Sequence, residues 1–389
     1  MNVMKKELKF KVPFSGFCGT TFINCFTSTY MFLENINVGK SDYECRQLDG
    51  KSCNSCGNCA KGGGTPISRQ EKYFFLFDTM CGRSSLRCRF DGKLTEMEKM
   101  IGETDPYEGD TENNIDFLFG FAGYEYRRLA APGEFKAAIE GSVGAGRPVI
   151  AKVKSGEGRF RVIIGYDGNK LICPDYKNAQ RPPKKAPKYD ELDALYVICG
   201  KTEPLYTVID GLERIVKVME YNISEKLWDG YIKKIGMYGG GGPGGDPDSL
   251  EKADIKEKQA RLKRVAETMW HTFNCHNFGE VFRQYRGDGE PSVYDAFSGM
   301  KKLRAPEFKE QWDRISGPCC GYTHDLAWAL IGLEECADWK RHVYKTGYFG
   351  EMAELVLEQI KKNDIEALDA IKKVLEILKK TGSFILSCQ

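Results

Sequence analysis

A cluster of cysteines in the first sixty residues has metal-binding spacing. Cys53, Cys56 and Cys59 are separated from one another by two residues each, and Cys45 precedes Cys53 by eight positions. Two overlapping Cys-x-x-Cys steps bring three thiolates within reach of one ion, and a fourth sulfur completes the tetrahedron that Zn²⁺ prefers. We therefore expect Cys45, Cys53, Cys56 and Cys59 to hold one structural zinc ion.

Two other interpretations of these cysteines stay open. Three closely spaced thiolates also suit an iron–sulfur cluster whose fourth ligand is Cys45 or Cys81. Against this, the sequence lacks the fourth-ligand spacing and the Cys-Pro pair of bacterial ferredoxins. The same cysteines can also be free thiols in a loop, because residues 40–70 are rich in glycine, serine and cysteine.

A second candidate for chemistry is Cys25, which falls near the start of an expected helix. Residues 22–36 have an apolar helical pattern, and Asn24 is a candidate N-cap. The unpaired N–H groups and the dipole of a helix N-terminus favour a thiolate there. Cys25 can equally be a small apolar residue of the core.

The strongest local pattern lies in residues 159–175. Residues 159–166 and 170–173 are expected to form two strands joined at Asp167 and Gly168, since Asp-Gly is a strong hairpin signal. Asp175 follows the second strand.

Together these features resemble the papain-like superfamily of bacteriocin-processing cysteine peptidases. The closer likeness is to the N-terminal domain of the butirosin-biosynthesis acyltransferases. The resemblance covers roughly residues 14–200. Its matching positions are Asn24 and Cys25 at a helix head with Thr27 and Ser28 beyond, Gly-Arg-Pro-Val at 146–149, Gly-Tyr-Asp at 165–167, and Asp175.

The resemblance implies a papain-like (cysteine proteinase) α+β domain with Cys25 as nucleophile, Asp175 as orienting acid and Asn24 as oxyanion neighbour. It implies cysteine-dependent acyl transfer, or hydrolysis of an amide or thioester, with a peptide, an acyl thioester or a small molecule as substrate. Cys18 is the rival nucleophile, because it precedes a glycine as the nucleophile of these peptidases often does.

Two groups of the family pattern are replaced. Arg159 stands where the catalytic histidine is expected, Gly19 replaces a glutamine that often donates to the oxyanion, and no histidine precedes His271. Arginine can pair with Asp175 but cannot shuttle a proton near neutral pH. Arg159 and Arg161 share one face of a strand, and one of them is expected near Asp175.

These replacements leave two alternatives to a working enzyme. One is a catalytically inactive papain-like protein whose groove binds a peptide or a small anion. The other is a metal-stabilised interaction module built on the cysteine-rich loop.

The whole chain divides into two regions of different pattern. Short strands are expected at 73–77, 124–129, 148–153 and 195–198, and helices at 133–143 and 206–221. After a glycine run at 239–245, helical periodicity prevails. We expect a papain-like domain over 1–240 with a cysteine-rich insertion at 40–70, and an all-α domain over 248–389.

Composition limits the partners and the compartment. A formal net charge of +2 over 389 residues argues against nucleic acid or an anionic membrane surface as partner. No signal-peptide pattern opens the sequence, and no window approaches the ~18 apolar residues of a membrane span. Fifteen cysteines, an odd number at irregular spacing, do not suggest a disulfide framework. We expect a cytoplasmic protein.

Overall fold

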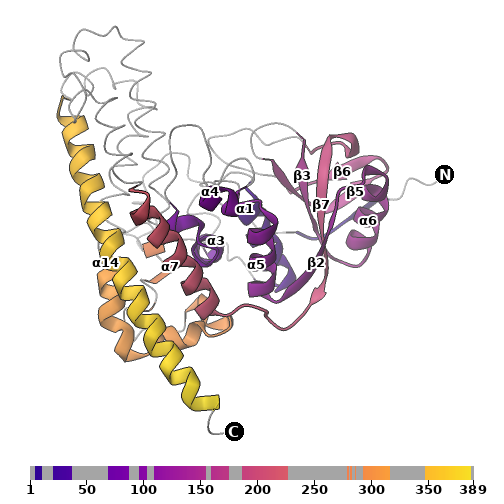
Figure 1. Ribbon diagram of the computed structural model, residues 1–389. Coiled ribbons are helices and arrows are strands. Elements are labelled where there is room, and N and C mark those ends of the chain that lie inside the picture. The colour runs from indigo at the N-terminus through magenta and orange to yellow at the C-terminus, as the bar shows by residue number, and fades with distance from the viewer. Residues whose placement is uncertain are drawn as a thin grey trace, which may run out of the picture. The chain divides into compact units, whose positions relative to one another are not determined.

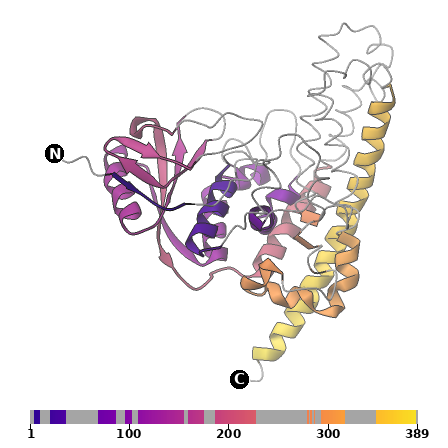
Figure 2. The same cartoon turned by 180° about the vertical axis from the view of Figure 1, so that it is seen from behind.

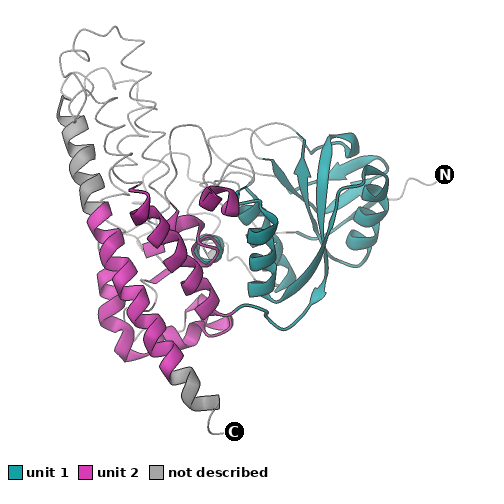
Figure 3. Cartoon of the chain, in the orientation of Figure 1, with its two compact units in different colours: residues 1–77, 102–206 teal, residues 78–101, 207–389 magenta. Residues whose placement is uncertain are grey.

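The computed structural model has an α+β architecture (Figure 1). The residues that the structure describes are 5–10, 21–36, 69–86, 96–102, 109–154, 159–174, 186–226, 278–279, 281–282, 285, 292–315 and 347–386. Within the last range, side chains are described for residues 361–380. The chain forms two compact units (Figure 3), of which one comprises Met1–Phe77 and Gly102–Tyr206 and the other Asp78–Ile101 and Thr207–Gln389.

The first unit contains an antiparallel sheet of four strands in the order β2-β7-β3-β4. Its strands are β2 (Tyr124–Leu129), β3 (Val149–Val153), β4 (Phe160–Ile163) and β7 (Leu192–Lys201). Strand β3 pairs on one side with β4 and on the other with β7, so it is central. The strands expected at 124–129, 148–153 and 195–198 are confirmed.

A second, three-stranded sheet of this unit contains the expected hairpin. Its order is β1-β5-β6, with β1 at Lys5–Glu7, β5 at Gly165–Asp167 and β6 at Lys170–Ile172. The predicted turn is confirmed, because Asp167 pairs with Lys170 and Gly168 has φ +58°.

The prediction of one strand over 159–166 is wrong, because the segment divides at Ile164 between the two sheets. The amide of Ile164 donates to Ile172 O, and its carbonyl accepts from Leu8 N, both at 2.9 Å. Strand β4 before it pairs with β3, whereas β5 after it pairs with β1 and β6. Gly165 permits this change, since a Cβ there would collide with the Lys6 carbonyl oxygen.

Helix α6 (Pro132–Gly144) covers one face of the four-stranded sheet, as expected for 133–143. Pro132 occupies the first turn, where its missing N–H is not needed. The core of this layer consists of apolar side chains from α6 and from the strands of both sheets. Its members are Leu129, Phe135, Ile139, Val143, Val149, Ala151, Val153, Ile163, Tyr166, Leu171, Leu192, Leu195 and Val197.

Helices α1 (Phe22–Leu33) and α5 (Glu112–Ala122) lie against the opposite face of that sheet (Figure 1). The ring of Phe22 meets those of Phe160 and Tyr196 at centroid distances of 5.4 and 5.2 Å. From α5, Phe119 stacks on Tyr126 of β2 at 4.2 Å. The sheet therefore separates an α6 layer from an α1/α5 layer.

The strand predicted at 73–77 is wrong, because these residues belong to helix α3 (Arg69–Met80). Tyr73 and Phe77 lie one helical turn apart, and both rings contact Tyr30 of α1, at 5.7 and 5.2 Å. A short apolar run does not distinguish a buried strand from a buried helix by its period. Packing against α1 stabilises the helical conformation of these residues.

The second unit is helical within its described residues. Helix α7 (Val208–Ser224) agrees with the helix expected over 206–221, and Thr207 and Asp210 form its capping box. Its further elements include η2 (Arg83–Ser85), α4 (Glu96–Ile101), η4 (Val293–Ala296), η5 (Met300–Arg304), η6 (Pro306–Phe308) and the 40-residue α14 (Gly347–Leu386). The glycine run and the predicted boundary at 240–248 lie outside the described residues, so that boundary stays a prediction.

Helices α7 and α14 run side by side in antiparallel orientation (Figures 1 and 2). Lys372 Nζ lies 2.6 Å from Glu220 Oε1, and Lys379 Nζ lies 2.6 Å from Glu213 Oε1. The steps of seven residues run in opposite directions along the two helices. These half-exposed ion pairs contribute little to the free energy of unfolding, but they show the register of the two helices.

Residues 78–101 join this unit through close contacts with α7. A Cβ on Gly211 would lie 2.7 Å from Met80 Sδ, so the helix and the segment touch at that glycine. Asn222 Nδ2 also donates to the Ser85 carbonyl at 2.6 Å.

None of the helices in the described ranges is both long and apolar enough to cross a membrane.

Two glycines of the first unit should respond to alanine in opposite directions. Gly123 has φ +72°, and a Cβ there would lie 2.8 Å from the Thr202 carbonyl oxygen. Gly123→Ala should therefore reduce the free energy of unfolding by about 1–3 kcal/mol. Gly141 lies inside α6, and a Cβ added there would meet no atom within 4 Å, so Gly141→Ala should raise it by about 0.5–1 kcal/mol. Urea unfolding of both variants measures this, and equal effects would contradict the assigned conformations.

Candidate functional site

The N-terminus of α1 differs from the prediction. Thr21 is the N-cap, and its Oγ1 accepts the amide N–H of Asn24 at 3.3 Å. Asn24 is thus the third residue of the helix, and the prediction that it caps the helix is wrong. The amide groups that favour an anion are those of the first turn, which ends at Asn24, so Cys25 follows them.

Cys25 lies inside the core and inside the helical hydrogen-bond ladder. Its amide N–H donates to the Thr21 carbonyl at 3.1 Å, which is the first regular bond of the helix. The residue has 0 % of its surface exposed. A substrate cannot reach this thiol in the observed conformation.

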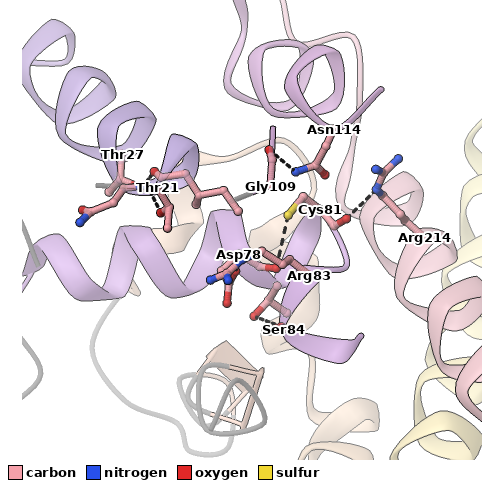
Figure 4. Close-up of polar contacts among 12 residues, drawn as sticks. Thr21, Thr27, Asp78, Cys81, Arg83, Ser84, Gly109, Asn114 and Arg214 are labelled. Atoms are coloured by element: carbon pink, nitrogen blue, oxygen red, sulfur yellow. Dashed lines mark hydrogen bonds and ion pairs between the residues drawn. The ribbon is translucent and has the colours of Figure 1, made fainter. Parts of the chain in front are cut away.

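Asn24 contributes to a buried polar layer between α1 and α3. Its side-chain oxygen accepts from Gln70 Nε2 at 2.9 Å, and both residues are fully buried. Thr27 Oγ1 donates to the Ile23 carbonyl at 2.7 Å (Figure 4 shows Thr21 and Thr27). The amide and hydroxyl groups beside Cys25 therefore make hydrogen bonds within the protein.

The sheet separates Arg161 from α1. In the β3–β4 ladder Arg161 stands opposite Ala151, a member of the α6 core, whereas Phe160 stands opposite Lys152 and faces Phe22. Successive side chains of a strand point to opposite faces, so Arg161 belongs to the α6 side. It is not placed to stabilise a thiolate at Cys25.

Arg159 lies two residues before Arg161 and therefore on the same face of the sheet. Its carbonyl accepts from Val153 N at 2.7 Å, and Val153 is also a member of the α6 core. The side chain of Arg159 is half-buried at the start of β4.

Arg161 lies near the end of the hairpin that leads to Asp175. Burial raises the pKa of the Cys173 thiol to about 12, and the Arg161 charge opposes that shift. Cys173 precedes Asp175 by two residues, but Asp175 lies outside the described residues. The predicted pairing of an arginine with Asp175 therefore stays a prediction.

A buried ion pair that the sequence reasoning missed lies in the α1 layer. Lys152 Nζ donates to Asp110 Oδ2 at 2.9 Å, and both side chains are buried. The ammonium also lies 6.0 Å from the ring centroid of Phe160. A lysine within the run Val-Ile-Ala-Lys-Val of an expected strand was the available signal, because a buried lysine needs a partner.

The second unit has a polar cluster around the end of α3 (Figure 4). Asp78 and Arg83 form an ion pair that is almost fully buried. Arg214 Nε donates to the Cys81 carbonyl at 2.6 Å, and Cys81 Sγ donates to the Asp78 carbonyl at 3.4 Å. Burial and the Asp78 charge raise the pKa of the Cys81 thiol to about 11, against the opposing effect of Arg214 and Arg83.

The predicted zinc ligands Cys45, Cys53, Cys56 and Cys59 lie outside the described residues. Within the described residues, no group of three or more His, Cys, Asp or Glu side chains could hold a metal ion.

Comparisons with models of protein families, with curated proteins and with solved structures find no match to this chain.

The described cysteines should react with iodoacetamide in an order set by burial. Cys199 is exposed and should be labelled first at pH 8. Cys25 and Cys81 are buried, and the raised pKa values of Cys81 and Cys173 keep those two thiols protonated at this pH. Peptide mass spectrometry of the native protein gives each rate. Labelling of Cys25 as fast as Cys199 would show that the core around α1 opens readily.

Proposed function

We propose that the first unit is a papain-like scaffold that binds a peptide or a small anion without thiol catalysis at Cys25. The observation that supports this most is the position of Cys25, whose thiol is buried and whose amide belongs to the helical ladder. The replacement of the expected histidine by Arg159 supports it further, because arginine cannot act as a general base.

The cation that we assign to such a ligand is Arg159. Its side chain is half-buried at the start of β4, whereas the side chain of Arg161 is buried. A guanidinium binds a carboxylate through two parallel hydrogen bonds, which gives both charge and geometry. The group that Arg159 contacts is then the carboxylate of a peptide, or another small anion.

Binding is tested by thermal unfolding of the full chain with acetate, inorganic phosphate and an unblocked tripeptide as probes. A ligand that binds only the folded state stabilises it by RT ln(1 + [L]/Kd), so the unfolding temperature rises with ligand concentration. Arg159→Gln should abolish the increase. Arg127→Gln, which removes an exposed arginine of β2, is the matched control and should retain it. No increase with any probe, or an increase that survives Arg159→Gln, would reject the proposal.

A second candidate is cysteine-dependent acyl transfer, or hydrolysis of an amide or thioester. The observation in its favour is the start of α1 at Phe22 with Thr21 as cap, since the anion-favouring end of the helix then follows Cys18 in the sequence. Sustained turnover of a generic thioester that is lost in Cys18→Ala and kept in Cys25→Ala would support this candidate over the first.

We also propose one structural zinc ion on Cys45, Cys53, Cys56 and Cys59, on the basis of their spacing. Such a site requires reduced thiols, so this proposal places the protein in the reducing cytoplasm.

Elemental analysis of protein purified without added metal should give one zinc per chain. Cys56→Ser should release the ion, because it removes the middle ligand of the two overlapping steps. Cys199→Ser is the matched control and should retain it. Metal-free wild-type protein would refute the zinc proposal, and iron in place of zinc would support the cluster alternative.

A further inference from the structure

Strand β2 forms one edge of the four-stranded sheet, and its outer side is free. Within the described part of the chain, β2 pairs with β7 alone, and no hydrogen bond reaches the backbone groups that point away from β7. The pairing has one irregularity, at which the extra residue is Cys199 of β7, so β2 itself is continuous. A continuous edge strand with unpaired N–H and C=O groups is a template for a further strand.

Two exposed side chains of β2 carry opposite charges on one face of the sheet. Arg127 stands opposite Val197, a member of the α6 core. Glu125 and Arg127 flank Tyr126, whose ring packs on α5, so both charged side chains lie on the α6 side. Both are exposed, and among the described residues neither side chain has an ion-pair or hydrogen-bond partner.

The order of these charges is self-complementary. Charges on an edge strand normally prevent pairing. In an antiparallel pair about a two-fold axis normal to the sheet and centred on Tyr126, however, each Glu125 faces Arg127 of the second copy. Opposite residues of such a pair lie about 4.5–5.5 Å apart at Cβ, within reach of an ion pair. Centring the pair on Glu125, Arg127 or Arg128 instead would place two like charges opposite each other.

We propose that β2 pairs with β2 of a second copy of this chain, centred on Tyr126 and held in register by two Glu125–Arg127 ion pairs. The four-stranded sheets of the two copies then form one antiparallel sheet. The pairing is short and its ion pairs are exposed, so the dimer is weak and sensitive to salt. The proposal does not depend on the proposed function, because Arg159 lies at β4, the other edge of the sheet.

Sedimentation equilibrium of the full chain tests the association over roughly 1–500 µM, the affinity range of small, transient interfaces. A reductant is present throughout, because Cys199 is an exposed thiol. The average mass of the wild type should rise with concentration toward that of a dimer. Added salt should weaken the association, because it screens exposed ion pairs.

Charge reversal tests the register. Glu125→Arg and Arg127→Glu should each raise the dissociation constant of the dimer by roughly tenfold or more, because each creates two like-charge contacts. An equal mixture of the two variants should associate about as tightly as the wild type, since every arginine then faces a glutamate of the other variant. Arg128→Glu is the matched control, because Arg128 faces the uncharged Tyr124 in this register, and it should change the constant by less than about threefold.

The proposal is overturned if the wild type stays monomeric over this range, or if its dimer tolerates both reversals, because another surface then forms it. It is equally overturned if the mixed variants do not associate. Circular dichroism establishes that each variant is folded. Should one reversal fail to fold, Glu125→Gln and Arg127→Gln replace the two variants, each with a smaller expected increase in the dissociation constant, and no increase from either would reject the proposal.

Discussion

The alternation of side chains along β3 and β4 is the constraint on which the first unit depends. Each strand directs successive residues to opposite faces, and both faces are covered, by α6 on one side and by α1 and α5 on the other. A shift of one residue in either strand would exchange Lys152 with a member of the α6 core and Phe160 with Arg161. The register of the strands therefore determines which charged side chain faces which helix.

The register of β3 and β4 also explains why the first unit contains a buried charge. The second unit contains a comparable buried ion pair. Lys152 lies on the α1 face, where burial removes its hydration, and Asp110 supplies the compensating charge. In the second unit, Asp78 and Arg83 pair at the end of α3. Buried pairs rarely add stability over apolar side chains of the same size, but they penalise any arrangement that separates the partners. Each pair thus favours one packing of its own unit over its alternatives.

Local sequence signals predicted the elements that are determined locally. The Asp-Gly turn, the edge strand β2, and helices α6 and α7 all agree with their predicted ranges, because turn residues, alternation, Pro132 and the Thr207 cap act within a few residues. The division at Ile164 and the helical state of 73–77 depend on partners that are remote in sequence, namely β1 and α1. Neither could be inferred from the segments alone.

The candidate site shows the same limit. From sequence, Arg159 and Arg161 were correctly placed on one face of a strand, but nothing indicated which helix that face meets. The apolar pattern predicts Asn24 as the N-cap, whereas the Asn24 amide donates to the hydroxyl of Thr21, three residues earlier. The Lys152–Asp110 pair was missed because its members are 42 positions apart.

The packing of α1 changes how its family-like motif is understood. Asn24 bonds Gln70, Thr27 bonds the Ile23 carbonyl, and Cys25 fills a position in the core. Each of these residues thus has a structural reason to be where it is, and their presence alone does not indicate catalysis. Lys152 on the α1 face of β3 has a reason of the same kind, because its ion pair with Asp110 favours one packing of this face, although an apolar residue there would avoid the cost of desolvation.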